Sequence, residues 1–285
     1  MRNIVASPAQ GTQMIDRTVA LMRLVATYRP KGARLTDLAE EAFLPAPTVR
    51  RILKRLVEHG LILQDCSERR YRLGHLAYEL GLSASHLTND ARDYRPLLDE
   101  LVRATGHTMY LLMRSGLDSV CIDRADAATS DCKLTLCVGD RLPLGVGVGG
   151  MALLAALPEN DAEAIIEVNQ SVYRRFVRTT GSTFREHLET ARKNGFIVRR
   201  SPVTPGVLGI GMVLPSCEGP PRLAVAGATK ARWFSERDRI EAVATMREII
   251  ARHAPSTNCD VGPIDIAAFA MGSADADQPQ AMVQS

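Results

Sequence analysis

Residues 44–60 read LPAPTVRRILKRLVEHG, and this stretch decides the fold of the first quarter of the chain. On a wheel of about 100° per residue, its apolar side chains occupy one side of a helix. The other side carries four cations, Arg50, Arg51, Lys54 and Arg55. Such a pattern alone is typical of a solvated amphipathic helix, so its neighbours must decide whether the charged side meets a partner.

The segments before this helix predict a helix-turn-helix. Residues 15–26 carry apolar side chains at a helical period, and Thr36 can cap a second short helix over 37–42. Residues 43–46 form a turn, and Pro47 suits the first position of the third helix, over 47–59, because the N–H missing there has no helical partner. Two short helices joined by a tight turn place the second where it can enter the major groove of DNA.

The segment after the third helix predicts a cationic wing. Residues 61–63 and 71–73 are strand-like and flank the polar loop 64–70, as in a β-hairpin. Arginines on or beside this hairpin suit contacts with phosphates or the minor groove. The residues expected to contact DNA are Thr36, Pro47, Thr48, Arg50, Arg51, Lys54, Arg55, Arg69, Arg70 and Arg72.

Length and charge distribution agree with a two-part protein. The chain has 285 residues, enough for two domains. Residues 1–75 hold 13 Lys and Arg against 7 Asp and Glu, whereas the rest holds 22 against 25, as expected when one domain meets a polyanion. The first residues, MRNIVASPAQ, lack a signal-peptide core, and the apolar stretch 144–157 is too short and glycine-rich to span a bilayer. We therefore expect a cytoplasmic protein that has no membrane partner.

The N-terminal segments resemble the DNA-binding module of the IclR family of bacterial transcription regulators. The family pattern is L-P-x-S-T-V-x-R-L-L, then L-x-x-x-G-Y/L, then Y-x-L-G. The matching residues are Thr48, Val49, Arg51, Leu53, Gly60, Tyr71, Leu73 and Gly74. Pro47 stands where the family usually has Ser, which removes a hydroxyl that would contact phosphate or cap the helix. The resemblance implies a winged helix-turn-helix over residues 11–74.

Residues 75–89 are expected to form a linker helix with an apolar stripe made of Leu76, Leu80, Ala84 and Leu87. The stripe suits either a partner subunit or packing within the chain. The resemblance favours a partner, because this connection contributes to dimers in the IclR family. A homodimer or a dimer of dimers would place two recognition helices on one side of a pseudo-palindromic operator.

Residues 90–254 predict a mixed α+β domain with a largely antiparallel sheet. Helices are expected over 90–105, 151–157 and 184–194, and after a capping box at 235–238. Strands are expected at 109–113, 120–124, 134–138, 196–199, 210–214 and 223–227. The resemblance implies that this domain is GAF-like and binds an effector. Residues 255–285, rich in Ala, Ser, Asp and Gln, predict a flexible tail.

Two segments of this domain are candidates for the effector site. The glycine-rich run 145–151 lacks the Lys-Ser/Thr of a nucleotide-binding loop and is better interpreted as a loop that, with a helix N-terminus, faces a small anion. The segment 199–210 aligns with the part that, in the family, lines the effector pocket with an acidic residue and a cysteine. The expected effector contacts are Gly147, Gly149, Gly150, Met151, Arg199, Arg200, Gly206, Leu208, Gly209 and Ile210.

This chain departs from the family in the second of these segments. It has arginines near the acidic position and Gly209 at the cysteine position. The departure predicts a negatively charged organic acid, with Arg199 or Arg200 either as its counter-ion or as plain surface residues. The segment from Gly139 onward resembles a branch often tied to the catabolism of aromatic compounds or organic acids. We therefore expect a ligand-responsive repressor or activator of a catabolic operon, with operator DNA and a small organic acid as partners and no cofactor.

Two alternatives would change the chemistry. An enzyme would need a nucleophile with a base or a metal cluster, but the six histidines show no HxxxH spacing and G-x-S-x-G is absent. His107 with Cys121 is the remaining thiol–imidazole candidate. A redox-sensing regulator would use some of the six cysteines, of which Cys121, Cys132 and Cys137 could approach one another, although their spacing fits no common zinc pattern.

Overall fold

The computed structural model describes residues 12–28, 30–84, 94–128, 136–176, 181–216 and 219–253. The chain divides into two compact units, residues 1–90 and 91–285. Each unit has a hydrophobic core of its own. The expected tail over 255–285 and the expected end of the linker helix beyond residue 84 lie outside the described residues.

The N-terminal unit is a winged helix-turn-helix, as expected. Its elements are α1 Gln13–Thr27, α2 Leu35–Ala42, α3 Ala46–Glu58, β1 Ile62–Gln64, β2 Tyr71–Leu73 and α4 His75–Ala84. β1 and β2 pair as an antiparallel hairpin, and Ala33 adds a further bridge to Tyr71. Leu21, Leu38 and Leu53 are fully buried, so α1, α2 and α3 each contribute to one core.

Two helices of this unit begin earlier than the sequence predicts. α2 begins at Leu35, and the backbone N–H of Arg34 donates to the carboxylate of Asp37 at 3.4 Å. Thr36 therefore lies inside the helix and does not cap it, which corrects the expectation. α3 begins at Ala46, so Pro47 occupies the second helical position rather than the first. The second position still lies in the first turn, where a missing N–H removes no helical hydrogen bond.

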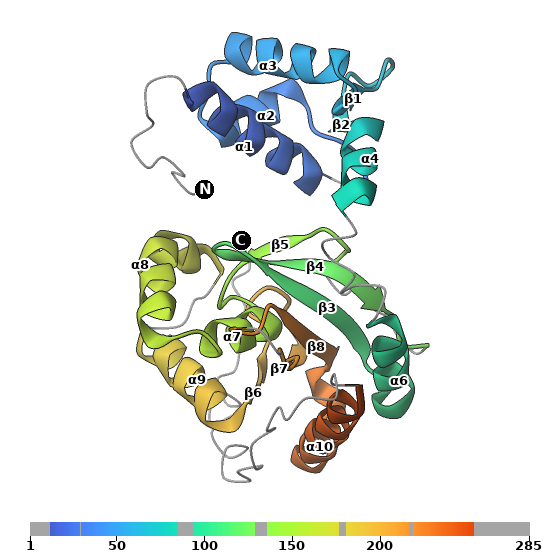
Figure 1. Ribbon diagram of the computed structural model, residues 1–285, viewed down its shortest axis with the longest axis vertical. Coiled ribbons are helices and arrows are strands. Elements are labelled where there is room, and N and C mark those ends of the chain that lie inside the picture. The colour runs from blue at the N-terminus through green and yellow to red at the C-terminus, as the bar shows by residue number, and fades with distance from the viewer. Residues whose placement is uncertain are drawn as a thin grey trace, which may run out of the picture. The chain divides into compact units, whose positions relative to one another are not determined.

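The C-terminal unit is a six-stranded antiparallel sheet with helices on both faces (Figure 1). The strand order is β5-β4-β3-β8-β7-β6. The strands are β3 Thr108–Ser115, β4 Asp118–Ala125, β5 Arg141–Pro143, β6 Phe196–Arg200, β7 Val207–Val213 and β8 Leu223–Lys230. The expected α+β class is thus confirmed.

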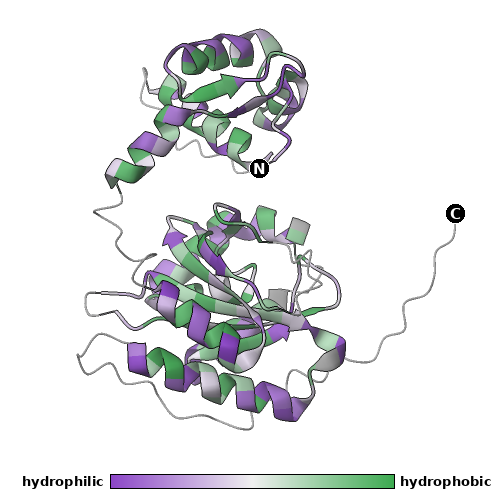
Figure 2. Cartoon of the chain, turned by 90° about the vertical axis from the view of Figure 1, so that its right-hand side faces the viewer, coloured by the Kyte–Doolittle hydropathy of each residue, from purple (hydrophilic) through white to green (hydrophobic). Residues whose placement is uncertain are grey.

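The helices of this unit form two layers. One face of the sheet packs against α6 Arg95–Thr105 and α10 Glu236–His253, which follows the short 3-10 turn Ala231–Trp233. The other face packs against α7 Val148–Ala155, α8 Glu159–Phe176 and α9 Gly181–Asn194. In Figure 2, hydrophobic residues run along the strands, whereas the helices in front mix them with hydrophilic residues. The expected capping box is confirmed, because Ser235 and Asp238 exchange backbone-to-side-chain hydrogen bonds at 2.8 and 3.3 Å.

Three elements of the C-terminal unit differ from the expectation. Residues 136–138 form no strand, residues 134 and 135 lie outside the described part, and the edge strand is β5 instead. α8 was not expected from the sequence. α7 begins at Val148, so Gly149 and Gly150 are helical and do not form a loop.

Candidate nucleic-acid interface and effector site

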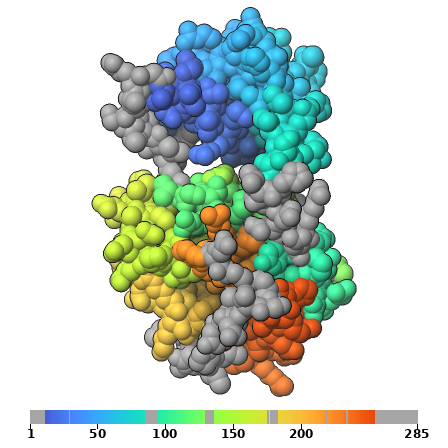
Figure 3. Space-filling view, viewed as in Figure 1, coloured from blue at the N-terminus to red at the C-terminus, as the bar shows by residue number. Residues whose placement is uncertain are grey.

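α3 separates its apolar residues from its cationic residues. Val49, Ile52 and Leu53 are buried in the core, whereas Arg50, Arg51, Lys54 and Arg55 are all exposed. α3 lies along an outer side of the N-terminal unit, where Figure 3 shows its light-blue atoms at the surface. The helix therefore presents the four cations of the predicted recognition face to solvent.

The four cations differ in their partners. Arg55 forms an ion pair with Glu58 and approaches Nε2 of His59 at 3.5 Å. Within the described part of the chain, Arg50, Arg51 and Lys54 form no hydrogen bond or ion pair. Pro47 is exposed and Thr48 half-buried at the start of the same helix, and Thr36 is exposed on α2. Three unpaired cations on one exposed helix face suit contacts with phosphates and base edges.

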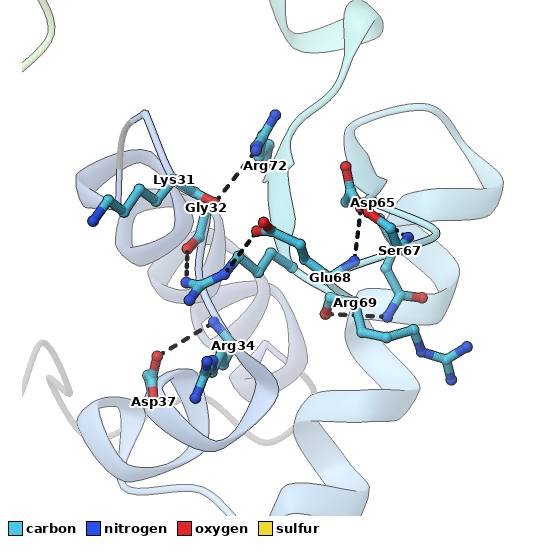
Figure 4. A network of polar contacts seen from close by, with 11 residues as sticks. Lys31, Gly32, Arg34, Asp37, Asp65, Ser67, Glu68, Arg69 and Arg72 are labelled. Atoms are coloured by element: carbon cyan, nitrogen blue, oxygen red, sulfur yellow. Dashed lines mark hydrogen bonds and ion pairs between the residues drawn. The ribbon is translucent and has the colours of Figure 1, made fainter.

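The carboxylate of Asp65 accepts several hydrogen bonds at the tip of the wing (Figure 4). Oδ1 of Asp65 accepts hydrogen bonds from the backbone N–H groups of Ser67 and Glu68, both at 2.9 Å, and from the Ser67 hydroxyl at 2.6 Å. These bonds stabilise the charged form and lower the pKa of Asp65 to about 2. Asp65 was not among the residues expected to be functional, although an Asp two residues before a Ser is typical of such a turn.

The three wing arginines have different roles in the structure. Arg70 is turned inward, with its side chain 20% exposed, and donates to the Gly32 carbonyl at 2.9 Å. Arg72 donates to the Lys31 carbonyl at 3.4 Å. Arg69 sits at the tip with φ +57°, is exposed and has no side-chain partner among the described residues. In Figure 4 its side chain extends away from the network.

The glycines expected to form an anion-binding loop instead allow α7 to pack closely on the sheet. A Cβ on Gly149 would come within 2.1 Å of Leu112, and a Cβ on Gly211 within 2.4 Å of the Val148 carbonyl oxygen. All eight residues of α7 are buried, Met151 completely. Gly149, Gly150 and Met151 are therefore packing residues, whereas Gly147 is the N-cap of α7.

The remaining residues expected at the effector site are divided between the two faces of the sheet. Leu208 and Ile210 are buried in the core against α6 and α10, while Gly209 on the same strand faces Val148 of α7. Gly206 is exposed in the turn before β7, with φ +77°. These residues therefore do not form one cluster.

Arg199 and Arg200 are adjacent, but only Arg199 is buried. Arg200 is exposed, whereas Arg199 is 8% exposed and its Nη2 donates to the carbonyls of Gly145 at 2.9 Å and Val146 at 3.3 Å. Burial lowers the pKa of Arg199 to about 10. Arg199 thus links β6 to the turn that precedes α7.

The structure gives little support to the thiol-based alternatives. Cys121 is buried, which raises the pKa of its thiol to about 12 and keeps it protonated. His107 packs edge-on against Phe234 at 4.8 Å, in the layer of α6 and α10, whereas Cys121 belongs to the opposite core, so the proposed thiol–imidazole pair is wrong. Cys132 lies outside the described residues. Within the described ranges no group of three potential metal ligands occurs, and no helix is long and apolar enough to cross a membrane.

Comparison with protein families assigns both units. Residues 14–65 match the IclR helix-turn-helix domain, and residues 83–253 match the bacterial transcriptional regulator IclR C-terminal domain. The second match alone covers more than half of the chain.

Individual relatives agree with the family matches. The HTH-type transcriptional regulator Rv1719 of Mycobacterium tuberculosis is 27% identical over 209 residues, which are 72% of this chain and 77% of the relative. The crystal structure of an IclR transcriptional regulator from Alicyclobacillus acidocaldarius superposes with a TM-score of 0.69 at 20% identity, covering 85% of this chain and 97% of that one. An IclR homologue from Microbacterium hydrocarbonoxydans, solved as a complex with 4-hydroxybenzoate, gives a TM-score of 0.63 at 18% identity, covering 84% and 99%.

Proposed function

This chain belongs to the IclR family of bacterial transcriptional regulators, and from that premise we propose that it controls a catabolic operon in response to a small organic acid. DNA binding and an effector-binding domain are properties of the family. The operon, the response to a ligand and the cytoplasmic location are our proposals. The exposed, unpaired cations of α3 are the observation that carries the DNA-binding part.

The proposed contacts with DNA follow from exposure and pairing. Arg50, Arg51 and Lys54 would reach base edges or flanking phosphates in the major groove, because they lie on the solvent side of the second helix of a helix-turn-helix. Arg69 would contact the backbone or the minor groove from the wing. If about six phosphates are contacted per dimer, the logarithm of affinity should fall with the logarithm of salt concentration with a slope near −5.

A dimer is the proposed state that binds DNA. None of the ten residues of α4 is buried within the single chain, although Leu80 is apolar and 55% exposed. A second copy of the chain that covers the Leu80 side of α4 would bring two recognition helices to one operator. A dimer of dimers would extend the same arrangement to two operators.

An organic acid is the proposed effector. The 4-hydroxybenzoate bound by the Microbacterium homologue supports a ligand of this class, because that protein shares the fold. The basic residues in the segment that the family uses for its effector pocket support an anion. Binding would favour one arrangement of the two winged helices and so change operator affinity.

The DNA-binding part is tested by selecting a site from random duplexes and measuring affinity by fluorescence anisotropy. We expect that the triple variant Arg50→Ala/Arg51→Ala/Lys54→Ala loses at least about 100-fold in affinity, since each base or phosphate contact contributes about 1–3 kcal/mol. A control with Arg103→Ala, Arg174→Ala and Arg237→Ala removes the same charge from exposed positions of the C-terminal unit. Equal affinity of the α3 variant and the wild type, or a salt slope near zero, would contradict the assignment.

A further inference from the structure

The loop between α2 and α3 carries an exposed aromatic ring. Phe43 is 79% exposed, more than any other large apolar residue whose side chain is described. A single exposed apolar residue is normal on a protein surface, but Pro45, Ala46 and Pro47 directly after it are exposed as well. Exposed apolar residues therefore lead from the loop into the first turn of the recognition helix.

The backbone at Phe43 is strained. Its φ is +53° and its ψ is 40°, which is the left-handed region. The N–H of Phe43 donates to the Glu40 carbonyl and the N–H of Leu44 to the Ala39 carbonyl, both at 3.1 Å. These bonds form a Schellman motif, in which this position is usually glycine because a Cβ there crowds the backbone. A residue held in such a conformation while its side chain stays exposed is a candidate for a functional contact.

Ala46 and Pro47 belong to the cationic side of α3. Arg50 lies three residues after Pro47 and four after Ala46, and these spacings put side chains on the same face of a helix. Phe43 precedes Ala46 by three residues, so their Cα atoms lie within about 11 Å of each other. The first turn of α3 holds no acidic residue, which leaves the positive end of the helix dipole open to a polyanion. The apolar patch, made of Phe43, Ala46 and Pro47, therefore borders the cationic face at the start of the helix.

Thymine is the base whose edge suits this patch. In a helix-turn-helix bound to DNA, residues at the N-terminal end of the second helix contact base edges. The side chains of Phe43, Ala46 and Pro47 hold no hydrogen-bonding group, and Pro47 also lacks a backbone N–H, so they are unsuited to phosphates and polar base edges. The C5-methyl of thymine is the apolar group that base pairs present in the major groove, and Ala and Phe are among the side chains that contact it.

We propose that the ring of Phe43, flanked by Ala46 and Pro47, contacts a thymine methyl group in the major groove of the operator. The inference rests on the proposed function, because it assigns base preference to the same helix-turn-helix. The cations of α3 would supply affinity for the duplex, and the apolar patch would add a preference for thymine. Each half of a pseudo-palindromic operator should then hold a thymine at the same position.

The first part of the test removes the methyl group alone. The full-length protein is titrated by fluorescence anisotropy with its selected site, in which each thymine in turn is replaced by deoxyuridine, which pairs with adenine as thymine does. At one thymine of each half-site we expect affinity to fall about fourfold, and about 15-fold when both halves are changed, since burying a methyl-sized group contributes about that factor.

The second part removes the ring. Phe43→Gly suits the left-handed backbone, so it should fold as the wild type does in thermal melts. We expect it to bind the selected site at least about fourfold more weakly and to bind thymine and deoxyuridine equally at the affected position. Its salt slope should equal that of the wild type, because the ring carries no charge. Val168→Ala, which trims an apolar residue that is 56% exposed in the C-terminal unit, is the matched control and should keep both affinity and discrimination.

Three outcomes would overturn the inference and leave the regulator. One is a selected half-site without thymine, and another is a site at which no replacement by deoxyuridine changes affinity. The third is a Phe43→Gly protein with the affinity and discrimination of the wild type, which would show that the ring serves another surface. A protein that binds no duplex at all would instead refute the proposed function, and this inference with it.

Discussion

At the scale of single residues, two glycines of the family pattern have a physical explanation. Gly60 follows the C-cap of α3 and has φ +73°, a backbone conformation that residues other than glycine rarely adopt. Gly74 follows β2 and approaches Gly60 so closely that its own Cβ would lie 2.1 Å from the Gly60 carbonyl oxygen. The N–H of Gly74 also donates to the Leu61 carbonyl at 2.8 Å. These contacts fix the hairpin against the end of the recognition helix.

We predict that Gly74→Ala destabilises the N-terminal unit by about 1–3 kcal/mol, because the added methyl meets rigid backbone rather than a side chain that can move. Hydrogen–deuterium exchange of β1 and β2 measures the loss. Gly81→Ala is the matched control, since nothing lies within 4 Å of its Cβ on α4, and it should be neutral or stabilise by up to about 1 kcal/mol. Equal exchange in the Gly74 variant and the wild type would show that the close approach relaxes without cost.

The sequence could not predict which of the neighbouring residues Arg199 and Arg200 is buried. Alternation along a strand predicts that the two side chains face opposite sides of the sheet. Which side is buried depends on the pairing of Arg199 with Gly209 on β7 and on the position of α7, and both are tertiary facts. The basic character of the segment could therefore be predicted, but the buried member of the pair could not.

At the scale of elements, the spacing of apolar residues predicted helices and strands well where one face of the element is buried and the other is exposed to solvent. The buried residues of α3 are those that the helical wheel places on its apolar side. The wing strands begin and end within one residue of the expected positions. α7 begins earlier than expected because its glycines have the composition of a loop, whereas in the structure they let a buried helix pack closely against the sheet. α8 was missed although Glu159 and Asp161 lie in its first turn, where acidic residues favour the start of a helix.

The turn at the tip of the wing is held by Asp65, and Arg69 in this turn is exposed and has no side-chain partner among the described residues. We expect that Arg69→Asn, which tolerates the left-handed backbone, weakens DNA binding and reduces the salt slope by about 0.9 for one lost phosphate contact. Arg70→Asn removes the same charge from a side chain bonded to Gly32, and its slope should stay near that of the wild type. A larger change in slope for Arg70 than for Arg69 would contradict these roles.

At the scale of the whole molecule, the sequence placed the positive charge in the first quarter of the chain, and the structure puts much of it on one helix and one hairpin. The two units have separate hydrophobic cores, because the buried residues of each unit pack only with residues of the same unit. Charge counting predicted which unit meets DNA. It could not predict the number of subunits, because that depends on surfaces that a single chain leaves uncovered.

The uncovered surface of α4 leads to a prediction about assembly. We expect Leu80→Glu to raise the dissociation constant of the proposed dimer at least about 100-fold, since a carboxylate buried against apolar surface costs several kcal/mol. Sedimentation over a range of concentrations measures this constant.

His75→Glu adds a negative charge to a polar, exposed position of the same helix and should leave assembly unchanged. Because two recognition helices must act together on a pseudo-palindrome, the Leu80 variant should also bind the full operator little better than a half-site. A Leu80→Glu protein that remains dimeric and binds the full operator like the wild type would place the subunit contact elsewhere than on the Leu80 side of α4.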